Sequence, residues 1–67
     1  MKNTAARIIR YLQKEGMPKS FDEIRNYLEE SDSITGICLR HLQAKGFVTD
    51  QKPGGWSLTE KGKKLEL

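Results

Sequence analysis

The sequence predicts an α+β domain in which three helices precede a two-stranded β-hairpin. Between residues 4 and 46, three stretches place apolar side chains at steps of three and four, the period of an amphipathic helix. After residue 46 the period changes to the alternation of a strand, interrupted by a proline and two glycines that favour a turn. We expect one domain over residues 1–67, because a chain of this length supports only one small core.

The first helix is expected to begin near Asn3 or Thr4, whose side chains can accept hydrogen bonds from free amides. It should end at Gly16, which can adopt a positive φ. Its apolar side contains Ala5, Ile8, Ile9 and Leu12. A basic stripe is expected on the other side, formed by Arg7, Arg10 and Lys14.

The second helix is marked by a capping box, in which Ser20 and Glu23 bond each other's backbone amides. It is expected to end near Glu29, and a serine or aspartate at 31–33 should cap the next helix. Before it, Pro18 excludes helix and makes the connector extended. The connector could therefore add a third short strand near Pro18.

The third helix is expected over residues 33–46 and has the clearest helical period in the chain. Its predicted inward face contains Ile34, Thr35, Cys38, Leu39 and Leu42. Gly46 should end it with a positive φ, next to the cation of Lys45. The predicted outward strip is made of small residues with one guanidinium: Ser33, Gly36, Ile37, Arg40 and Ala44. Gly36 stands out there, since glycine inside a helix costs about 1 kcal/mol relative to alanine.

The hairpin is expected to have strands around 47–49 and 56–58, joined by a turn over 50–55 whose tip carries Lys52. Thr59 can cap one further helical turn over residues 60–65.

Composition argues against several classes of function. The single cysteine, Cys38, cannot form an intramolecular disulfide, and its inward position is typical of a small hydrophobe. The sequence has no apolar run that could cross a membrane and no signal-peptide pattern, so we expect a cytoplasmic protein. It also lacks metal-ligand spacing, a phosphate-binding loop and a nucleophile motif, so we expect neither an enzyme nor a cofactor or metal site.

Charge is distributed unevenly along the chain, whose net charge is +3. Residues 1–20 are basic, residues 21–33 are acidic, and residues 34–67 are basic again. Basic surfaces favour an anionic partner such as nucleic acid, although a solvated surface explains any single lysine as well.

Two motifs in the second half carry a resemblance to a known family. The stretch from Leu39 to Val48, LRHLQAKGFV, resembles the end of the recognition helix in bacterial and archaeal winged helix-turn-helix regulators. The stretch from Trp56 to Gly62, WSLTEKG, is similar to the segment that closes the wing in MarR-like and PadR-like members. The resemblance implies a three-helix bundle with a C-terminal wing.

In that family the third helix enters the major groove of DNA, and the wing lies along the backbone or the minor groove. Carried over by position, the resemblance implies a helix over 33–46 in the major groove and a wing over 52–55. The DNA-binding residues would be Ser33, Gly36, Ile37, Arg40 and Lys52. Arg40 could pair with guanine, Ile37 could touch a thymine methyl, and Ser33 could bond a base or phosphate.

Winged helices also serve as protein-interaction modules, and this second reading stays open. Here Ile37, Ala44 and the wing would form an apolar-centred patch, and the segregated charge would steer a protein partner. Glu29, Glu30 and Asp32 bear on the choice, because carboxylates near a phosphate backbone oppose binding. The sequence leaves the oligomeric state and the target sequence open.

Overall fold

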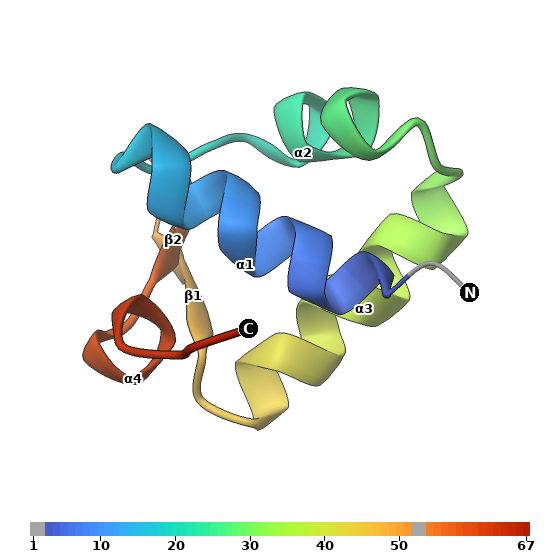
Figure 1. The fold of residues 1–67 in the computed structure, drawn as a ribbon. Helices are drawn as coiled ribbons and strands as arrows, with labels where there is room; N and C mark the ends of the chain where they lie inside the picture. Colours follow the sequence, from blue (N-terminus) through green and yellow to red (C-terminus); the bar gives the residue numbers. More distant parts are fainter. Residues whose placement is uncertain (1–2, 52–53) are drawn as a thin grey trace.

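The computed structural model has an α+β architecture in which three helices are followed by a two-stranded antiparallel sheet and a short fourth helix (Figure 1). It describes residues 3–51 and 54–67. The elements are α1 (Thr4–Glu15), α2 (Phe21–Leu28), α3 (Asp32–Ala44), β1 (Val48–Gln51), β2 (Gly55–Leu58) and α4 (Glu60–Lys63). In the described ranges no helix is both long enough and apolar enough to cross a membrane.

Local capping interactions fix where the helices begin. Asn3 caps α1 by accepting a hydrogen bond from the amide of Ala6 at 3.0 Å. The capping box expected at α2 is confirmed, because Ser20 and Glu23 each accept from the other's backbone amide at 3.1 Å. Ser31 caps α3 through the amide of Ile34.

The end of α3 confirms the role expected of Gly46, although the helix itself is shorter than the predicted range 33–46. Gly46 has a φ of 82°, and its amide donates to the carbonyl of Gln43. The amide of Phe47 reaches back to the carbonyl of Leu42 at 2.9 Å. These two bonds satisfy the last free carbonyls of the helix and turn the chain sharply into β1.

The sheet pairs Val48 with Leu58 at one end and Gln51 with Gly55 at the other. In place of a third strand near Pro18, the connector supplies a single bridge between Lys19 and Trp56. The two residues exchange both backbone hydrogen bonds, at 2.9 and 2.7 Å. Lys19 directly precedes Ser20, the N-cap of α2, so the connector has little extended backbone to pair with β2.

The core lies between α1, α2, α3 and the start of the hairpin. Its buried apolar residues are Ile8, Ile9, Leu12, Ile24, Leu28, Leu39, Leu42 and Val48. Thr35 is also fully buried, as expected from its position on the inward face. Ile34 was predicted on that face, and this prediction is wrong: its side chain is 42% exposed. It lies about 100° around the helix from Thr35, beyond the arc that α1 and α2 cover.

Aromatic stacking and polar contacts add to this core. Tyr11 of α1 and Tyr27 of α2 stack with their ring centroids 4.1 Å apart. Arg7 turns toward the same pair, with its guanidinium 5.8 Å from the Tyr27 ring centroid. Arg7 therefore belongs to the α1–α2 contact and does not continue the basic stripe predicted along α1.

The C-terminal segment is fastened to the earlier elements by side chains that bond backbone carbonyls. Thr59 caps α4 and donates its hydroxyl to the carbonyl of Gly46 at 2.5 Å. The Gln13 amide of α1 donates to the carbonyls of Gly62 and Leu65, at 3.2 and 2.9 Å. The segment after β2 is therefore held against both α1 and the end of α3.

Candidate nucleic-acid interface

The exposed face of α3 holds three of the residues expected to bind DNA. Ser33, Ile37 and Arg40 are all exposed, and the side chain of Ile37 is 64% accessible. Ile37 lies two residues from both Thr35 and Leu39, a rotation of about 200° that places it opposite the buried side. Ser33 and Arg40 are near neighbours of Ile37 on the helix surface, at spacings of four and three residues. These residues therefore form one continuous strip facing away from the core.

Gly36 lies on the flank of this strip, next to α2. A methyl group at Gly36 would have its nearest neighbour outside the local chain at 3.9 Å, the Cε2 atom of Phe21. This distance is an ordinary van der Waals contact, and φ at Gly36 is not positive. Close packing against α2 therefore does not explain why a glycine occurs here.

We expect Gly36→Ala to raise the free energy of unfolding by about 0.5–1 kcal/mol, because alanine restricts the unfolded chain and the added methyl fits. Chemical denaturation of the two proteins measures this difference. A decrease in stability would show that α2 packs more tightly on Gly36 than the 3.9 Å spacing indicates.

The fifth expected residue, Lys52, lies outside the described residues, as does Pro53. The strands on either side of this turn are described, and Gln51 pairs with Gly55. A methyl group at Gly55 would lie only 2.5 Å from the carbonyl oxygen of Lys19, and the φ of Gly55 is 101°. Glycine is needed at this end of β2, because the hairpin passes directly against the backbone of the connector and the φ is positive.

Arg25 of α2 pairs with two carboxylates, one from Asp22 in the same helix and one from Asp32 at the start of α3. The Arg25 guanidinium lies 2.8 Å from the Asp32 carboxylate and 3.3 Å from that of Asp22. The hydrogen bond that Arg25 donates to Asp32, together with the negative charges of Asp22 and Asp32, raises the pKa of Arg25. Asp22 and Arg25 are three residues apart in one helix, so that pair could be expected from the sequence. The pair with Asp32 forms across the turn and could not.

Glu29 and Glu30 are the two acidic residues near the start of α3 that do not pair with Arg25. Within residues 3–51 and 54–67 neither forms an ion pair closer than 4.0 Å. Glu29 ends α2 in the left-handed conformation, with a φ of 57°. Burial raises the pKa of the Cys38 thiol, and the charge of Glu30 adds to this effect. Glu30 therefore places negative charge beside α3, and Cys38 stays a protonated thiol at neutral pH.

The C-terminal end of α3 is basic. Lys45 ends the helix, and the Lys61 ammonium donates to the Lys45 carbonyl at 2.9 Å. The same ammonium lies 4.9 Å from the centroid of the Phe47 ring. Sequence reasoning did not select Lys61, because only the folding of α4 against the end of α3 brings it there. The helix thus has negative charge beside its first turn and positive charge beyond its last turn.

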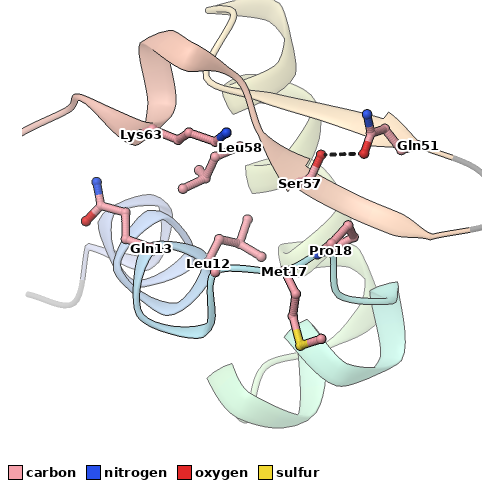
Figure 2. Close-up of a pocket in the computed structure, with 9 residues that line it drawn as sticks. Leu12, Gln13, Met17, Pro18, Gln51, Ser57, Leu58 and Lys63 are labelled. Carbon is pink, nitrogen blue, oxygen red and sulfur yellow. Dashed lines mark hydrogen bonds between the residues drawn. The ribbon is translucent and has the colours of Figure 1, made fainter.

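A separate open groove of about 420 Å³ lies between the end of α1, the connector and the hairpin (Figure 2). Its apolar surface comes from Leu12, Met17, Pro18 and Leu58. On the hairpin side Ser57 donates its hydroxyl to the side-chain oxygen of Gln51 at 3.0 Å (Figure 2). The groove brings together segments far apart in the chain, so no sequence motif announces it. Across the described parts of the chain, no group of three or more metal-ligating side chains is present.

Comparison with protein-family models, with curated proteins and with solved structures found no match.

Proposed function

We propose that this chain is a winged helix-turn-helix domain that binds double-stranded DNA as a small transcriptional regulator. In this proposal α3 enters the major groove, and the hairpin, as the wing, lies along the backbone or the minor groove. The order of three helices followed by an antiparallel hairpin is compatible with this layout. The observation that carries the proposal is the exposed strip of Ser33, Ile37 and Arg40 on a helix fixed at both ends.

Each residue of the strip has a chemical role available to it. The guanidinium of Arg40 can donate two hydrogen bonds to O6 and N7 of guanine, and the side chain of Ile37 can contact a thymine methyl. Ser33 can bond a base edge or a phosphate, and Lys52 would neutralise a phosphate at the wing. Within the described residues, Arg40 has no ion pair that would compete for its guanidinium.

The charge difference between the ends of α3 suggests how the helix would be oriented. Phosphates are attracted to Lys45 and Lys61 at the C-terminal end and repelled by Glu29 and Glu30 at the other. We therefore expect the closest backbone contacts near the C-terminal half of α3. In this arrangement Gly36 would let the DNA approach closely, and Gly36→Ala would weaken DNA binding while stabilising the fold.

Arg40→Ala should lower affinity for a preferred site and reduce discrimination at one base pair by roughly 1–3 kcal/mol, because the pairing with guanine is lost. Fluorescence anisotropy on a set of duplexes selected from a random pool measures both effects. Arg40→Lys is the matched control, since it keeps the charge but lacks the planar fork for two parallel bonds. It should retain most non-sequence-specific affinity and still lose discrimination. Equal selectivity of all three proteins would contradict a reading role for Arg40.

A second candidate function is a protein-interaction module, and one observation favours it. Ile34 and Ile37 are both exposed on α3, at 42% and 64%, and Glu30 lies beside the same helix. An apolar centre with charge at its edge is the usual composition of a protein interface. A partner suited to this surface would present apolar residues surrounded by lysine or arginine.

The double variant Glu29→Gln, Glu30→Gln separates the two candidates by the sign of its effect. If α3 binds DNA, removing both charges should strengthen duplex binding by a few tenths to about 1 kcal/mol at low salt, and by less at high salt. If the acidic end faces a basic protein, the same variant should associate with it more slowly. Asp32 is left unchanged, because its pair with Arg25 links α2 to α3. If the variant bound both DNA and the protein partner as tightly as the wild type, the acidic turn would belong to neither interface.

A further inference from the structure

The α3–β1 junction, which we define as Lys45, Gly46 and Phe47, is the short segment that joins the exposed strip of α3 to the hairpin. Its three amides all bond back to the end of α3. The acceptors, at 3.1, 3.0 and 2.9 Å, are the carbonyls of His41, Gln43 and Leu42. The helix therefore fixes one side of the junction.

The three carbonyls of the junction are all bound by the segment that begins α4. The Thr59 hydroxyl donates to the carbonyl of Gly46 at 2.5 Å, and the Thr59 amide donates to that of Phe47 at 3.0 Å. The Lys61 ammonium donates to the carbonyl of Lys45 at 2.9 Å. Figure 1 shows α4 beside the turn from α3 into β1. Because every amide and carbonyl of the junction has a partner, its direction is set from both sides.

Lys61 contributes to this arrangement through a long side chain that reaches two residues of the junction. Besides bonding the Lys45 carbonyl, its ammonium lies 4.9 Å from the ring centroid of Phe47. A hydrogen bond with a charged donor is stronger than one between neutral groups. The backbone next to Lys61 is held as well, because the carbonyl of Gly62 accepts from the Gln13 side-chain amide of α1 at 3.2 Å. Lys61 therefore connects the junction to an anchored segment.

The two cations at this end of α3 are available to a ligand to different degrees. Lys45 is exposed, and over residues 3–51 and 54–67 its ammonium forms no ion pair. The Lys61 ammonium already has a carbonyl and an aromatic ring as partners. Lys45 is therefore the better placed of the two to bond a phosphate, whereas Lys61 is engaged with the protein itself.

We propose that Lys61 is a positioning residue for DNA binding, which holds the α3–β1 junction so that α3 and the hairpin contact one duplex together. This inference rests on the proposed function of the chain and adds the residue that aligns its two DNA-binding elements. A duplex would meet the exposed strip of α3 and the hairpin at once, so the direction of the junction decides whether both contacts form. Lys61 acts through Lys45 and Phe47, and the direct phosphate contact belongs to Lys45.

Losing the Lys61 contact should lower the fraction of molecules whose junction has the direction that suits binding. The apparent dissociation constant rises in inverse proportion to this fraction, so a fall to about 10–20% weakens binding roughly five- to tenfold. The salt dependence should stay unchanged, because its slope reports the number of phosphates neutralised and Lys61 contacts none. Removing a direct phosphate contact would behave differently and lower the slope by about 0.9.

Two matched variants, Lys61→Met and Lys45→Met, test this division of roles. Each removes one ammonium from the end of α3 and keeps a long unbranched side chain. Fluorescence anisotropy measures their affinity, at several salt concentrations, for a duplex selected from a random pool. We expect Lys61→Met to bind roughly five- to tenfold more weakly with the wild-type slope, and Lys45→Met to lower the slope by about 0.9. Lys61→Arg should bind within about twofold of the wild type, because a guanidinium can also donate to the carbonyl and lie over the ring.

Amide hydrogen exchange without DNA checks that Lys61→Met changes the junction and leaves the rest of the domain folded. The amide of Thr59, which donates to Phe47, should exchange faster in the variant. The amide of Ile24, which donates to Ser20 at the start of α2, should exchange as in the wild type. Equal acceleration at both amides would show a loss of overall stability and overturn the positioning role.

The binding data separate failure of this inference from failure of the proposed function. Unchanged affinity of Lys61→Met would show that the junction keeps its direction without Lys61. A slope lowered by about 0.9 in Lys61→Met would make Lys61 a phosphate contact. Each of these results overturns the positioning role and leaves DNA binding intact. Absence of duplex binding by the wild type would instead overturn the proposed function, and this inference with it.

Discussion

Leu42→Ala is expected to lower the free energy of unfolding by roughly 2–5 kcal/mol, the range for removing a large buried side chain from a packed core. Leu42 is only 4% exposed and belongs to the cluster joining α1, α2, α3 and β1. Its carbonyl also accepts the hydrogen bond from Phe47 that closes the end of α3. The truncation leaves this backbone bond in place, so the loss measures packing. Urea denaturation followed by circular dichroism gives the difference.

Ile37→Ala is the matched control for this change, because it shortens an aliphatic side chain on the same helix. Ile37 is 64% exposed, and alanine has the higher helix propensity, so stability should change by less than about 0.5 kcal/mol. If Leu42→Ala cost as little as Ile37→Ala, the buried side of α3 would be wrongly assigned.

Gly62→Ala is expected to destabilise the domain by about 1–3 kcal/mol or more, because a methyl group there would overlap its neighbours. An added Cβ would collide with the carbonyl oxygen of Phe47 and lie 3.0 Å from the Cδ2 atom of Leu58. The Phe47 oxygen cannot easily move away, since it accepts the amide of Thr59 at 3.0 Å. The thermal midpoint of the variant, compared with that of wild type, measures the effect.

The two helical glycines Gly36 and Gly62 should therefore respond to alanine with opposite signs. Alanine lowers the entropy of the unfolded chain equally at both positions. The difference between the two changes in the free energy of unfolding therefore measures the cost of the collision at Gly62. A neutral or stabilising Gly62→Ala would mean that α4 can move away from Phe47 without loss of stability, and that its contacts with Gln13 and Lys45 contribute little.

The helices of this fold could be predicted from the sequence because their boundaries are local. The capping box of Ser20 and Glu23 and the positive φ of Gly16 and Gly46 each depend on a few neighbouring residues. The hairpin could be predicted from the glycines before Trp56, but the turn expected over 50–55 is too long, since β1 extends through Gln51 and β2 begins at Gly55.

Long-range packing explains where these predictions fail. The apolar period of α3 includes Ile34, but this side chain is 42% exposed because it lies beyond the arc of the helix that α1 and α2 cover. Likewise, a strand near Pro18 was reasonable from the extended connector, yet the contact with Trp56 involves only Lys19. Both the exposure of Ile34 and the single bridge at Lys19 are decided by packing between segments that are far apart in the sequence.

The candidate site could likewise be predicted where it depends on a single helix. Helical periodicity placed Ser33, Ile37 and Arg40 on one exposed strip, and the structure agrees. It could not show that Arg25 would pair with Asp32, or that Lys61 would reach the end of α3, because both contacts join different elements.

Trp56, which forms the backbone bridge with Lys19, also provides an optical probe of folding. Trp56 is the single tryptophan of the chain, and it lies half-buried where the hairpin meets the connector between α1 and α2. Its fluorescence therefore reports the docking of the hairpin, whereas far-ultraviolet circular dichroism reports mainly α1, α2 and α3. Unfolding curves that coincide in both signals would indicate a single cooperative unit, and a fluorescence change at lower denaturant would indicate that the hairpin detaches while the helices stay packed.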